Sequence, residues 1–193
     1  MFIDTRPPDD PGDAAGIYAA DVEVFGHLPN FTQAFSLRPQ VYAAWRGLIG
    51  AVRAEMDPRR YELASVAAAR ALDCTYCMLA HGSVLAREHM DADAVRRLAL
   101  GEDAGLTPAE IAVGDLAAKV ATDATSVTQA DVDRLREHGL SDAEVLDVIL
   151  AAAARSFFAK ALDGAGALAD ARFAELEPAL RDALTVGRPI ATA

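Results

Sequence analysis

Aromatic residues make up only 6% of this chain of 193 residues, while alanine dominates an apolar fraction of 52%. Aromatic and β-branched side chains favour strands, whereas alanine has the highest helix propensity. No run of alternating apolar and polar residues suggests a sheet. The composition therefore predicts an all-α fold, with closely spaced helices packed in layers as a single bundle.

Long apolar segments and an excess of positive charge are also missing. The longest apolar run, VILAAAA at 148–154, is far shorter than the roughly 18 residues of a membrane-spanning helix. The first residues, MFIDTRPPDDPGD, show neither the basic nor the apolar region of a signal peptide. A formal net charge of −11 disfavours nucleic acid, whose phosphates are bound by lysine and arginine. We therefore expect a cytoplasmic protein that binds neither a membrane nor nucleic acid.

Helix start signals recur along the chain after a polar beginning. Residues 1–12 hold several aspartates and prolines and are predicted to form a flexible arm, followed by a single domain over 13–193. Within the domain, the predicted helix caps are Asp57, Asp91, Thr107, Thr128 and Ser141. Proline follows Asp57 and Thr107, at the first helical position, where proline is favoured.

Two further helical segments follow from apolar spacing and glycine placement. The stretch RPQVYAAWRGLIGAVRAEM has the helical apolar period, through Val41, Trp45, Leu48, Ile49 and Val52. The helix that begins at Ser141 is predicted to end at Gly164, and a last helical stretch is predicted over roughly 166–184. We expect Trp45 to lie in the core.

The chain has only two cysteines, and they lie within one helical turn, in Cys74-Thr75-Tyr76-Cys77. His81 follows four residues later, and Glu62 precedes the pair by twelve residues. If a helix begins near Cys74, then Cys74, Cys77 and His81 share one of its faces. A chain that places its whole complement of thiols in one turn beside a histidine is predicted to use them chemically.

The chemistry predicted for this cluster is thiol-based redox. The start of a helix stabilises a thiolate, and paired cysteines so placed have pKa values of about 3.5 to 7.5, against about 8.5 for free cysteine. A peroxide oxidises such a thiolate to a sulfenic acid, which the second thiol converts to a disulfide. His81 can donate a proton to the leaving oxygen, with Glu62 on the preceding helix as a proton relay.

Other uses of the same residues stay open. Cys74, Cys77 and His81 can supply three zinc ligands, with Glu62 or water as the fourth, in a zinc-binding protein that is not an enzyme. The pair can also serve a thiol–disulfide oxidoreductase or a redox sensor without peroxidase turnover. A lyase or hydrolase acting on a small cyclic acid between subunits would not need the thiols.

These residues resemble the signature of a known family. Glu62, Cys74-x-x-Cys77 and His81, separated by eleven and three residues, are similar to the motif of the AhpD-like alkylhydroperoxidases, the peroxidase-related branch of the carboxymuconolactone decarboxylase superfamily. The likeness covers residues from about 24 to 166. It implies an all-α fold that assembles as homo-oligomers, commonly trimers or hexamers, and peroxidase activity with no cofactor and no metal.

The resemblance also implies a role for each residue. Cys77 would be the peroxidatic thiol, near His81 and Glu62, and Cys74 the more accessible resolving thiol of a redox-active disulfide. The substrate would be a peroxide and the reductant an external dithiol of the dihydrolipoyl type, with a peroxiredoxin as a further partner in some relatives. Those relatives have histidine where this chain has Tyr76, a phenol that is a poor base at neutral pH and is kept as a site-lining candidate. The relay would then depend on Glu62 and His81.

Overall fold

The structure is a computed structural model and describes residues 1–192. Within these residues it is all-α: ten α-helices and three short 3₁₀ helices, with one isolated bridge between Ala169 and Ile190 and no strand. The prediction of an all-α fold is confirmed. The α-helices are α1 Ala15–Phe25, α2 Asn30–Ala34, α3 Pro39–Glu55, α4 Pro58–Ala71, α5 Thr75–Glu88, α6 Ala92–Leu100, α7 Pro108–Asp123, α8 Gln129–Glu137, α9 Asp142–Ala165 and α10 Pro178–Leu184.

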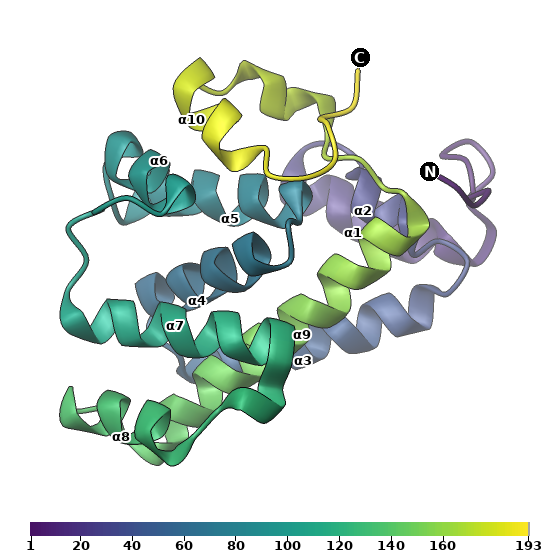
Figure 1. The fold of residues 1–193 in the computed structure, drawn as a ribbon. Coiled ribbons are helices and arrows are strands. Elements are labelled where there is room, and N and C mark those ends of the chain that lie inside the picture. The colour runs from purple at the N-terminus through teal and green to yellow at the C-terminus, as the bar shows by residue number, and fades with distance from the viewer. Residues whose placement is uncertain (193) are drawn as a thin grey trace.

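Helix α4 lies at the centre of the bundle and packs against α5, α7 and α9 (Figure 1). It can occupy this place because most of its side chains are apolar or small and are buried. Ala64 and Ala68 allow the neighbouring helices to approach its backbone closely. Helix α9 runs past both α4 and α3, while α10 covers α5 and α6 from the other side. The central pair α4 and α5 is therefore enclosed between α9 and the C-terminal elements.

The buried side chains form two clusters that meet along α4 and α9. The thiol-side core, around α5, includes Tyr42, Cys74, Cys77, Met78, Leu79 and Phe158. The distal core, around α7 and the first half of α9, includes Ala64, Ala68, Leu116, Ala117, Leu135 and Val148. Aromatic and sulfur-containing side chains thus gather on the thiol side, and alanine fills much of the distal side.

The predicted helix starts agree with the structure. The side chains of Asp57 and Asp91 accept hydrogen bonds from backbone amides in the first turns of α4 and α6. Reciprocal capping boxes are formed by Thr107, Thr128 and Ser141 at the starts of α7, α8 and α9. These are local interactions within four residues, which is why the sequence alone reveals them.

Three predictions about helices need correction. Helix α9 does not end at Gly164 but continues to Ala165, and Gly166 is the residue with the left-handed conformation, at φ 70°. No single helix covers 166–184, because a bridge, the 3₁₀ helix Ala171–Glu175 and a proline precede the short α10. The apolar stripe of α3 is only partly buried, since Val41 and Leu48 are 44% and 49% exposed.

Residues 1–12 contact the body of the protein at several points. The amide of Phe2 donates to the carbonyl of Ala165 at 2.8 Å, and the amide of Arg6 donates to Ser36 Oγ at 2.9 Å. Tyr18 in turn donates its hydroxyl hydrogen to the carbonyl of Arg6. The flexibility of this arm stays a prediction. In the part of the chain that is described, every helix is too short or too polar to cross a membrane.

Candidate active site

The two helices that carry the candidate site are joined by a very short turn. Asp73 has a positive φ of 52°, which aspartate tolerates better than most residues. The amide of Asp73 donates to the carbonyl of Arg70, and that of Cys74 donates to the carbonyl of Ala69. This pair of hydrogen bonds is a Schellman motif that ends α4. As a result, Cys74 becomes the residue before the first turn of α5, and Cys77 lies within that turn.

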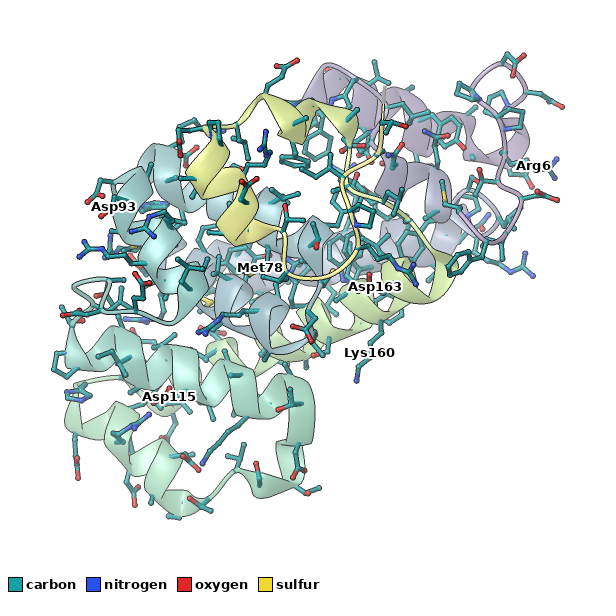
Figure 2. The ribbon with its side chains drawn as sticks, turned by 45° about the horizontal axis from the view of Figure 1, so that its top comes forward. Arg6, Met78, Asp93, Asp115, Lys160 and Asp163 are labelled. Atoms are coloured by element: carbon teal, nitrogen blue, oxygen red, sulfur yellow. The ribbon has the colours of Figure 1, made fainter. Side chains whose placement is uncertain are left out.

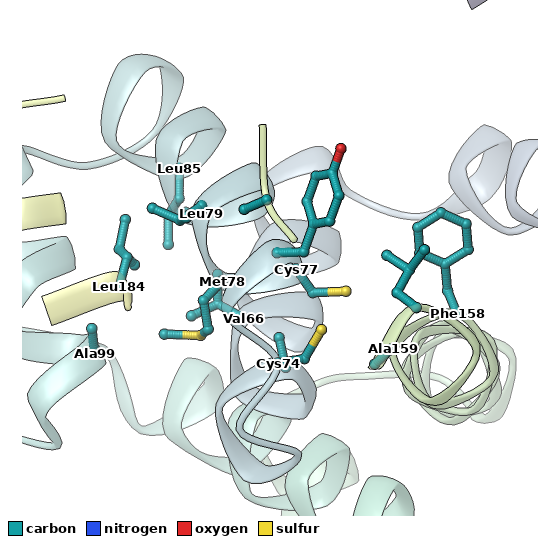
Figure 3. Close-up of a cluster of buried hydrophobic side chains, with 14 of the residues drawn as sticks. Val66, Cys74, Cys77, Met78, Leu79, Leu85, Ala99, Phe158, Ala159 and Leu184 are labelled. Atoms are coloured by element: carbon teal, nitrogen blue, oxygen red, sulfur yellow. The ribbon is translucent and has the colours of Figure 1, made fainter. Parts of the chain in front are cut away.

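Both cysteines are free thiols in the interior of the protein. Their sulfur atoms point toward the segment of α9 that carries Phe158 and Ala159 (Figure 3). Cys74 is 0% and Cys77 is 2% exposed, so the prediction that Cys74 is the more accessible thiol is wrong for this structure. Any reactant must therefore enter through a movement of the elements that cover the pair.

Arg155 of α9 is the charged group that meets Cys77. Its Nη1 lies 3.9 Å from Cys77 Sγ, and its Nη2 donates to the hydroxyl of Tyr61 at 3.1 Å. Arg155 as a whole is 3% exposed, and its guanidinium carbon lies 5.8 Å from the centres of the Trp45 and Phe158 rings. A buried cation at this position favours an anion on the sulfur of Cys77.

Sequence reasoning missed Arg155. A signal was present, because Arg155 is the only charged residue between Asp147 and Lys160 in an alanine-rich helix. A basic residue inside such a run is buried only if an acceptor or an anion meets it. The partner comes from a distant part of the chain, however, so the sequence did not say which one.

Glu62 and His81 form a buried pair beside the thiols. His81 Nδ1 lies 2.6 Å from Glu62 Oε2, and both side chains are largely shielded from solvent. Burial alone would raise the pKa of Glu62, but the attraction of His81, Arg53 and Arg155 lowers it. Burial and the charge of Arg155 lower the pKa of His81, against the effect of Glu62. At neutral pH the pair is therefore a carboxylate that accepts a hydrogen bond from a neutral imidazole.

This arrangement leaves Nε2 of His81 as a proton acceptor. His81 follows Cys77 by four residues on α5, so the two side chains are neighbours on one helix face. The structure thus forms two pairs from the predicted residues, Cys74 with Cys77 and Glu62 with His81, and the charge of Arg155 acts on both pairs.

The two thiols have opposite electrostatic surroundings. The hydrogen bond from Cys74 and the positive charge of Arg155 lower the pKa of Cys77 in spite of its burial. The interaction with Cys77 and burial raise the pKa of Cys74, whereas the carboxylate of Asp163 raises the pKa of both thiols. Cys77 is therefore the thiol of the pair that more readily becomes a thiolate.

Tyr76, which lies between the cysteines in sequence, takes part in a different network. Its hydroxyl donates to Asp170 Oδ2 at 2.6 Å and accepts from the amide of Phe31 at 3.2 Å. Asp170 also accepts from the amide of Asn30 at 2.7 Å. Burial and the Asp170 charge raise the pKa of Tyr76. The phenol therefore links α5 to α2 and to the segment after α9.

The segment after α10 covers the start of α5. The amide of Gly187 donates to Thr75 Oγ1 at 2.7 Å, and a Cβ at this glycine would lie only 2.0 Å from the carbonyl oxygen of Asp73. Arg188 Nε lies 3.7 Å from Asp163 Oδ1, and Asp163 lies beside this segment (Figure 2). We call residues 185–192 the C-terminal strap. The strap lies over the first residue of α5 and the turn before it.

A zinc site would need a different donor set from the one observed. Within residues 1–192, no group of three or more His, Cys, Asp or Glu side chains is arranged to hold a metal ion. The guanidinium of Arg155 beside Cys77 would also repel a divalent cation, and Nδ1 of His81 is already bonded to Glu62. The residues that are present therefore fit thiol chemistry better than zinc binding.

Comparison with known proteins identifies the fold and the family segment. Residues 39–101, which include Glu62, Cys74, Cys77 and His81, match the model of the Carboxymuconolactone decarboxylase family. A solved structure from Ralstonia eutropha JMP134, described as an alkylhydroperoxidase AhpD core and an uncharacterized peroxidase-related protein, superposes with a TM-score of 0.75. The match has 22% identity and covers 95% of this chain and 98% of that one. The predicted resemblance is confirmed. The chain thus has the fold of that AhpD core structure, and its residues 39–101 resemble the Carboxymuconolactone decarboxylase family.

Two further structures share the AhpD-like fold. An uncharacterized peroxidase-related protein from Silicibacter sp. TM1040 has a TM-score of 0.72 and 18% identity, over 89% of this chain and 90% of its own. A cysteine-to-alanine variant of the debrominase Bmp8, in complex with 2,3,4-tribromopyrrole, has a TM-score of 0.71 and 16% identity, over 95% and 96%. Among curated protein sequences, none matches the chain.

Proposed function

We propose that this AhpD-like chain is a thiol-dependent peroxidase that reduces hydroperoxides through Cys77 and Cys74. The observation that carries the proposal is the buried cysteine pair with Arg155 beside Cys77, because this geometry favours one thiolate at neutral pH. The peroxidase-related proteins of the same fold point in the same direction.

In the first step, the thiolate of Cys77 attacks the terminal oxygen of the hydroperoxide. The sulfur–oxygen bond forms as the oxygen–oxygen bond breaks, so that the sulfur loses two electrons and the peroxide gains them. The products are a sulfenic acid on Cys77 and an alkoxide, which takes up a proton to become an alcohol. His81 accepts the thiol proton through Nε2 and passes it to the alkoxide, while Glu62 stabilises the transient imidazolium.

In the second step, the sulfur of Cys74 attacks the sulfur of the Cys77 sulfenic acid. The hydroxyl group leaves with the proton of the Cys74 thiol as water, and a disulfide remains. Cys74 precedes α5 and Cys77 lies in its first turn, so the two residues need only a local rearrangement to form the bond. An external dithiol of the dihydrolipoyl type then reduces the disulfide by exchange.

The first experiment is intact-mass analysis with free-thiol titration of the fully reduced protein, before and after one equivalent of an organic hydroperoxide. We expect rapid loss of two hydrogen atoms and of both thiols, followed by recovery with dihydrolipoamide. Thiols that stay unreacted with hydrogen peroxide and with organic hydroperoxides would contradict the proposal. Native mass analysis of protein purified without chelator tests for zinc in the same sample.

Thiol–disulfide exchange without peroxidase turnover is the main alternative. The burial of both sulfur atoms makes a protein disulfide a poor partner, since a bulky reactant must reach sulfurs that are almost fully covered. A small hydroperoxide needs less space to reach the buried sulfur atoms. Reduction of a model disulfide much faster than of any hydroperoxide would favour the alternative.

Reductive debromination of a small aromatic ring is a second candidate. A debrominase shares the fold over nearly the whole chain, and in this protein Trp45 and Phe158 stack 4.0 Å apart beside Arg155. The Cys77 thiolate would take the bromine from a ring carbon, and that carbon takes up a proton in its place. Cys74 then attacks the sulfenyl bromide, so that a disulfide forms and bromide leaves with the Cys74 proton. Repeating the mass experiment with 2,3,4-tribromopyrrole separates the two activities, because only debromination releases bromide.

Self-association is also part of the proposal. Helices α3 and α9 expose a neighbouring stripe of uncharged side chains that comprises Val41, Leu48, Leu146, Leu150 and Phe157. In a chain with a net charge of −11, an uncharged face is where a second copy meets the least repulsion. We propose a homo-oligomer, a trimer or hexamer, through this face. Sedimentation analysis of the protein and of a Leu150→Glu variant tests it, and an unassociated protein would contradict it.

The remaining partners belong to the same proposal. A cytoplasmic location suits a thiol pair that must be kept reduced. A peroxiredoxin is the further partner that the resemblance implies, and it would exchange with the pair only after the elements that cover the two sulfur atoms have moved aside.

A further inference from the structure

The C-terminal strap, residues 185–192, connects the helix that carries the cysteines with the helix toward which their sulfur atoms point. The amide of Gly187 donates to Thr75 Oγ1 at 2.7 Å, at the start of α5. The next residue, Arg188, donates from Nη2 to the carbonyl of Asp163 at 3.0 Å, near the end of α9. Because the sulfur atoms point from α5 toward α9 (Figure 3), the strap bridges these two helices at one end of their contact.

We propose that the strap is the gate of the thiol pair, and that its release from α5 and α9 gives an external dithiol its path to the sulfur atoms. Cys74 and Cys77 are almost fully buried, so a dithiol reaches their disulfide only when a covering element moves. The inference deepens the proposed function, and rests on it for the identity of the reactant. The opening itself can be tested without any peroxide.

The strap is held more weakly than α9, the other element beside the sulfur atoms. Each strap residue is at least partly exposed, whereas α9 is a helix of 24 residues with a buried face. Beyond the contacts of Gly187 and Arg188, the strap is attached by a hydrogen bond from the Ala191 amide to the Ala169 carbonyl, at 2.8 Å. A segment with few buried contacts and few hydrogen bonds opens at a lower free energy than the whole protein.

A fixed point for the movement lies directly before the strap. Leu184, the last residue of α10, is fully buried. It packs against Gly82 of α5, where a Cβ would lie only 2.6 Å from a methyl carbon of Leu184. This contact keeps α10 on α5 while the strap moves. Thr185 follows with φ −91° and ψ 80°, outside the helical range, so the chain leaves the helix there and the movement begins at this residue.

Arg188 is the side chain that holds the gate closed. Its Nε lies 3.7 Å from Asp163 Oδ1, and its guanidinium carbon lies 4.8 Å from the centre of the Phe2 ring. Phe2 is itself attached to the end of α9, since its amide donates to the carbonyl of Ala165 at 2.8 Å. Both α9 and the N-terminal arm thus hold the strap through one side chain, and its removal should favour the open form.

Gly187 fits the strap closely against the turn before α5. A Cβ at this position would overlap the carbonyl oxygen of Asp73, a backbone atom that cannot turn aside as a flexible side chain can. Asp73 and Thr75, the two residues that Gly187 contacts, are the neighbours of Cys74 in sequence. An alanine at position 187 therefore forces the strap away from the backbone beside the buried Cys74.

The competing path to the thiol pair runs beside His81, whose side chain is 14% exposed. His81 lies six residues after Thr75, about 9 Å further along the axis of α5. A reactant that enters beside His81 does not pass the strap. Substitutions in the strap therefore distinguish the two paths.

The test is the rate at which N-ethylmaleimide modifies the thiols of the fully reduced protein, followed by intact mass. Gly187→Ala should raise this rate by about tenfold or more, because a methyl group forced into a packed place is costly. Arg188→Met should raise it by about two- to tenfold, the change that loss of one hydrogen bond makes in an opening equilibrium. Unchanged rates in both variants would overturn the inference in favour of the path beside His81.

The chain offers a matched control for each variant. Gly164→Ala adds the same methyl group at an exposed position of α9, where a Cβ would have open space. Arg87→Met removes the same charge from an exposed position on α5. Neither control should change the modification rate by more than about twofold.

Urea dependence distinguishes opening of the strap from unfolding of the whole protein, even where a variant is less stable. A local opening exposes little surface, so the modification rate should depend only weakly on urea below the unfolding transition. A rate that rises as steeply with urea as global unfolding requires would overturn the inference.

Hydrogen exchange gives a second measurement that does not depend on thiol reactivity. The amides of Gly187 and Ala191 should exchange faster than those in the middle of α9, and faster still in Arg188→Met. Strap amides that exchange as slowly as those of α9 would contradict the gate.

Activity separates this inference from the proposed function. If Gly187→Ala and Arg188→Met are modified faster but none of the proteins consumes peroxide, the gate stands and the peroxidase proposal fails. If peroxide is consumed, and dihydrolipoamide restores the thiols of Gly187→Ala no faster than those of the unaltered protein, the peroxidase proposal stands and the gate fails.

Discussion

Tyr76 and Cys77 are consecutive residues in the first turn of α5, yet their surroundings are opposite. The Tyr76 hydroxyl donates to the carboxylate of Asp170, and its pKa is raised by burial and by that charge. The Cys77 sulfur faces the guanidinium of Arg155, and its pKa is lowered. The comparison teaches that the sign of the nearest buried charge separates a structural hydrogen-bond donor from a nucleophile. Both charges come from distant parts of the chain, α9 and the segment after it.

The largest expected effect is on Cys77 itself. Cys77→Ser should abolish hydroperoxide consumption, because no thiolate remains in the place that Arg155 faces. Cys74→Ser should permit one turnover and stop at the sulfenic acid of Cys77, because no resolving thiol is left. Peroxide consumption with dihydrolipoamide, followed by trapping of the sulfenic acid with dimedone, measures both. Undiminished turnover in both variants would show that the pair is not the reacting group.

A smaller effect is expected for the proton relay. Glu62→Gln should slow peroxide reduction by about 10²-fold, since general acid–base catalysis is typically worth 10²–10⁴-fold. The carboxylate raises the pKa of His81, so its removal should move the acidic limb of the pH–rate profile to lower pH. Glu88→Gln, an exposed carboxylate on the same helix as His81, is the matched control. An unchanged pH–rate profile in Glu62→Gln would show that Glu62 takes no part in the mechanism.

Tyr76→Phe tests the other side of the comparison. Removal of the hydroxyl leaves Asp170 Oδ2 without its 2.6 Å donor in a buried place, which should lower the free energy of unfolding by about 1–3 kcal/mol. The rate of peroxide reduction should change less than about twofold, because the phenol points to a different network from the thiols. Urea unfolding and steady-state rates measure the two quantities. A rate loss as large as that of Glu62→Gln would place Tyr76 in the catalytic machinery.

The smallest effect concerns stability and pH. The pKa of His81 in the folded protein lies below its ordinary value of 6.5, so the unfolded chain binds more protons between the two values. Stability should therefore fall by about 1 kcal/mol for each pH unit as the pH drops below about 6.5. Urea unfolding at neutral and mildly acidic pH measures this slope. It should be shallower in His81→Asn and unchanged in His138→Asn, an exposed histidine.

Much of the fold could be predicted because its signals are local. Capping boxes at Thr107, Thr128 and Ser141 connect residues three apart, so the sequence contains both partners. The predictions failed where packing overrides propensity. Val41 and Leu48 fit the apolar period of a helix but remain exposed. The residues after Gly166, which the sequence predicts to be helical, instead begin with a bridge and a short 3₁₀ helix.

In the candidate site, too, the local features could be predicted from the sequence and the long-range contacts could not. The spacing of Cys74, Cys77 and His81 puts them on one face of one helix, which any α-helix would do. Glu62 meets His81 because the Schellman turn at Asp73 folds α4 back along α5. Burial of the thiols could not be anticipated, since it depends on α9 and on the strap over the start of α5, and the strap contacts Thr75 from 112 residues away in sequence.

The sequence by itself determined the all-α character, the start of each major helix and the grouping of two thiols with a histidine, because these depend on neighbours within one or two turns. Only the tertiary structure decided which thiol bears the charge. Arg155 meets Cys77 across 78 residues of chain. A Coulomb interaction depends on distance in space and on burial, and folding alone sets both.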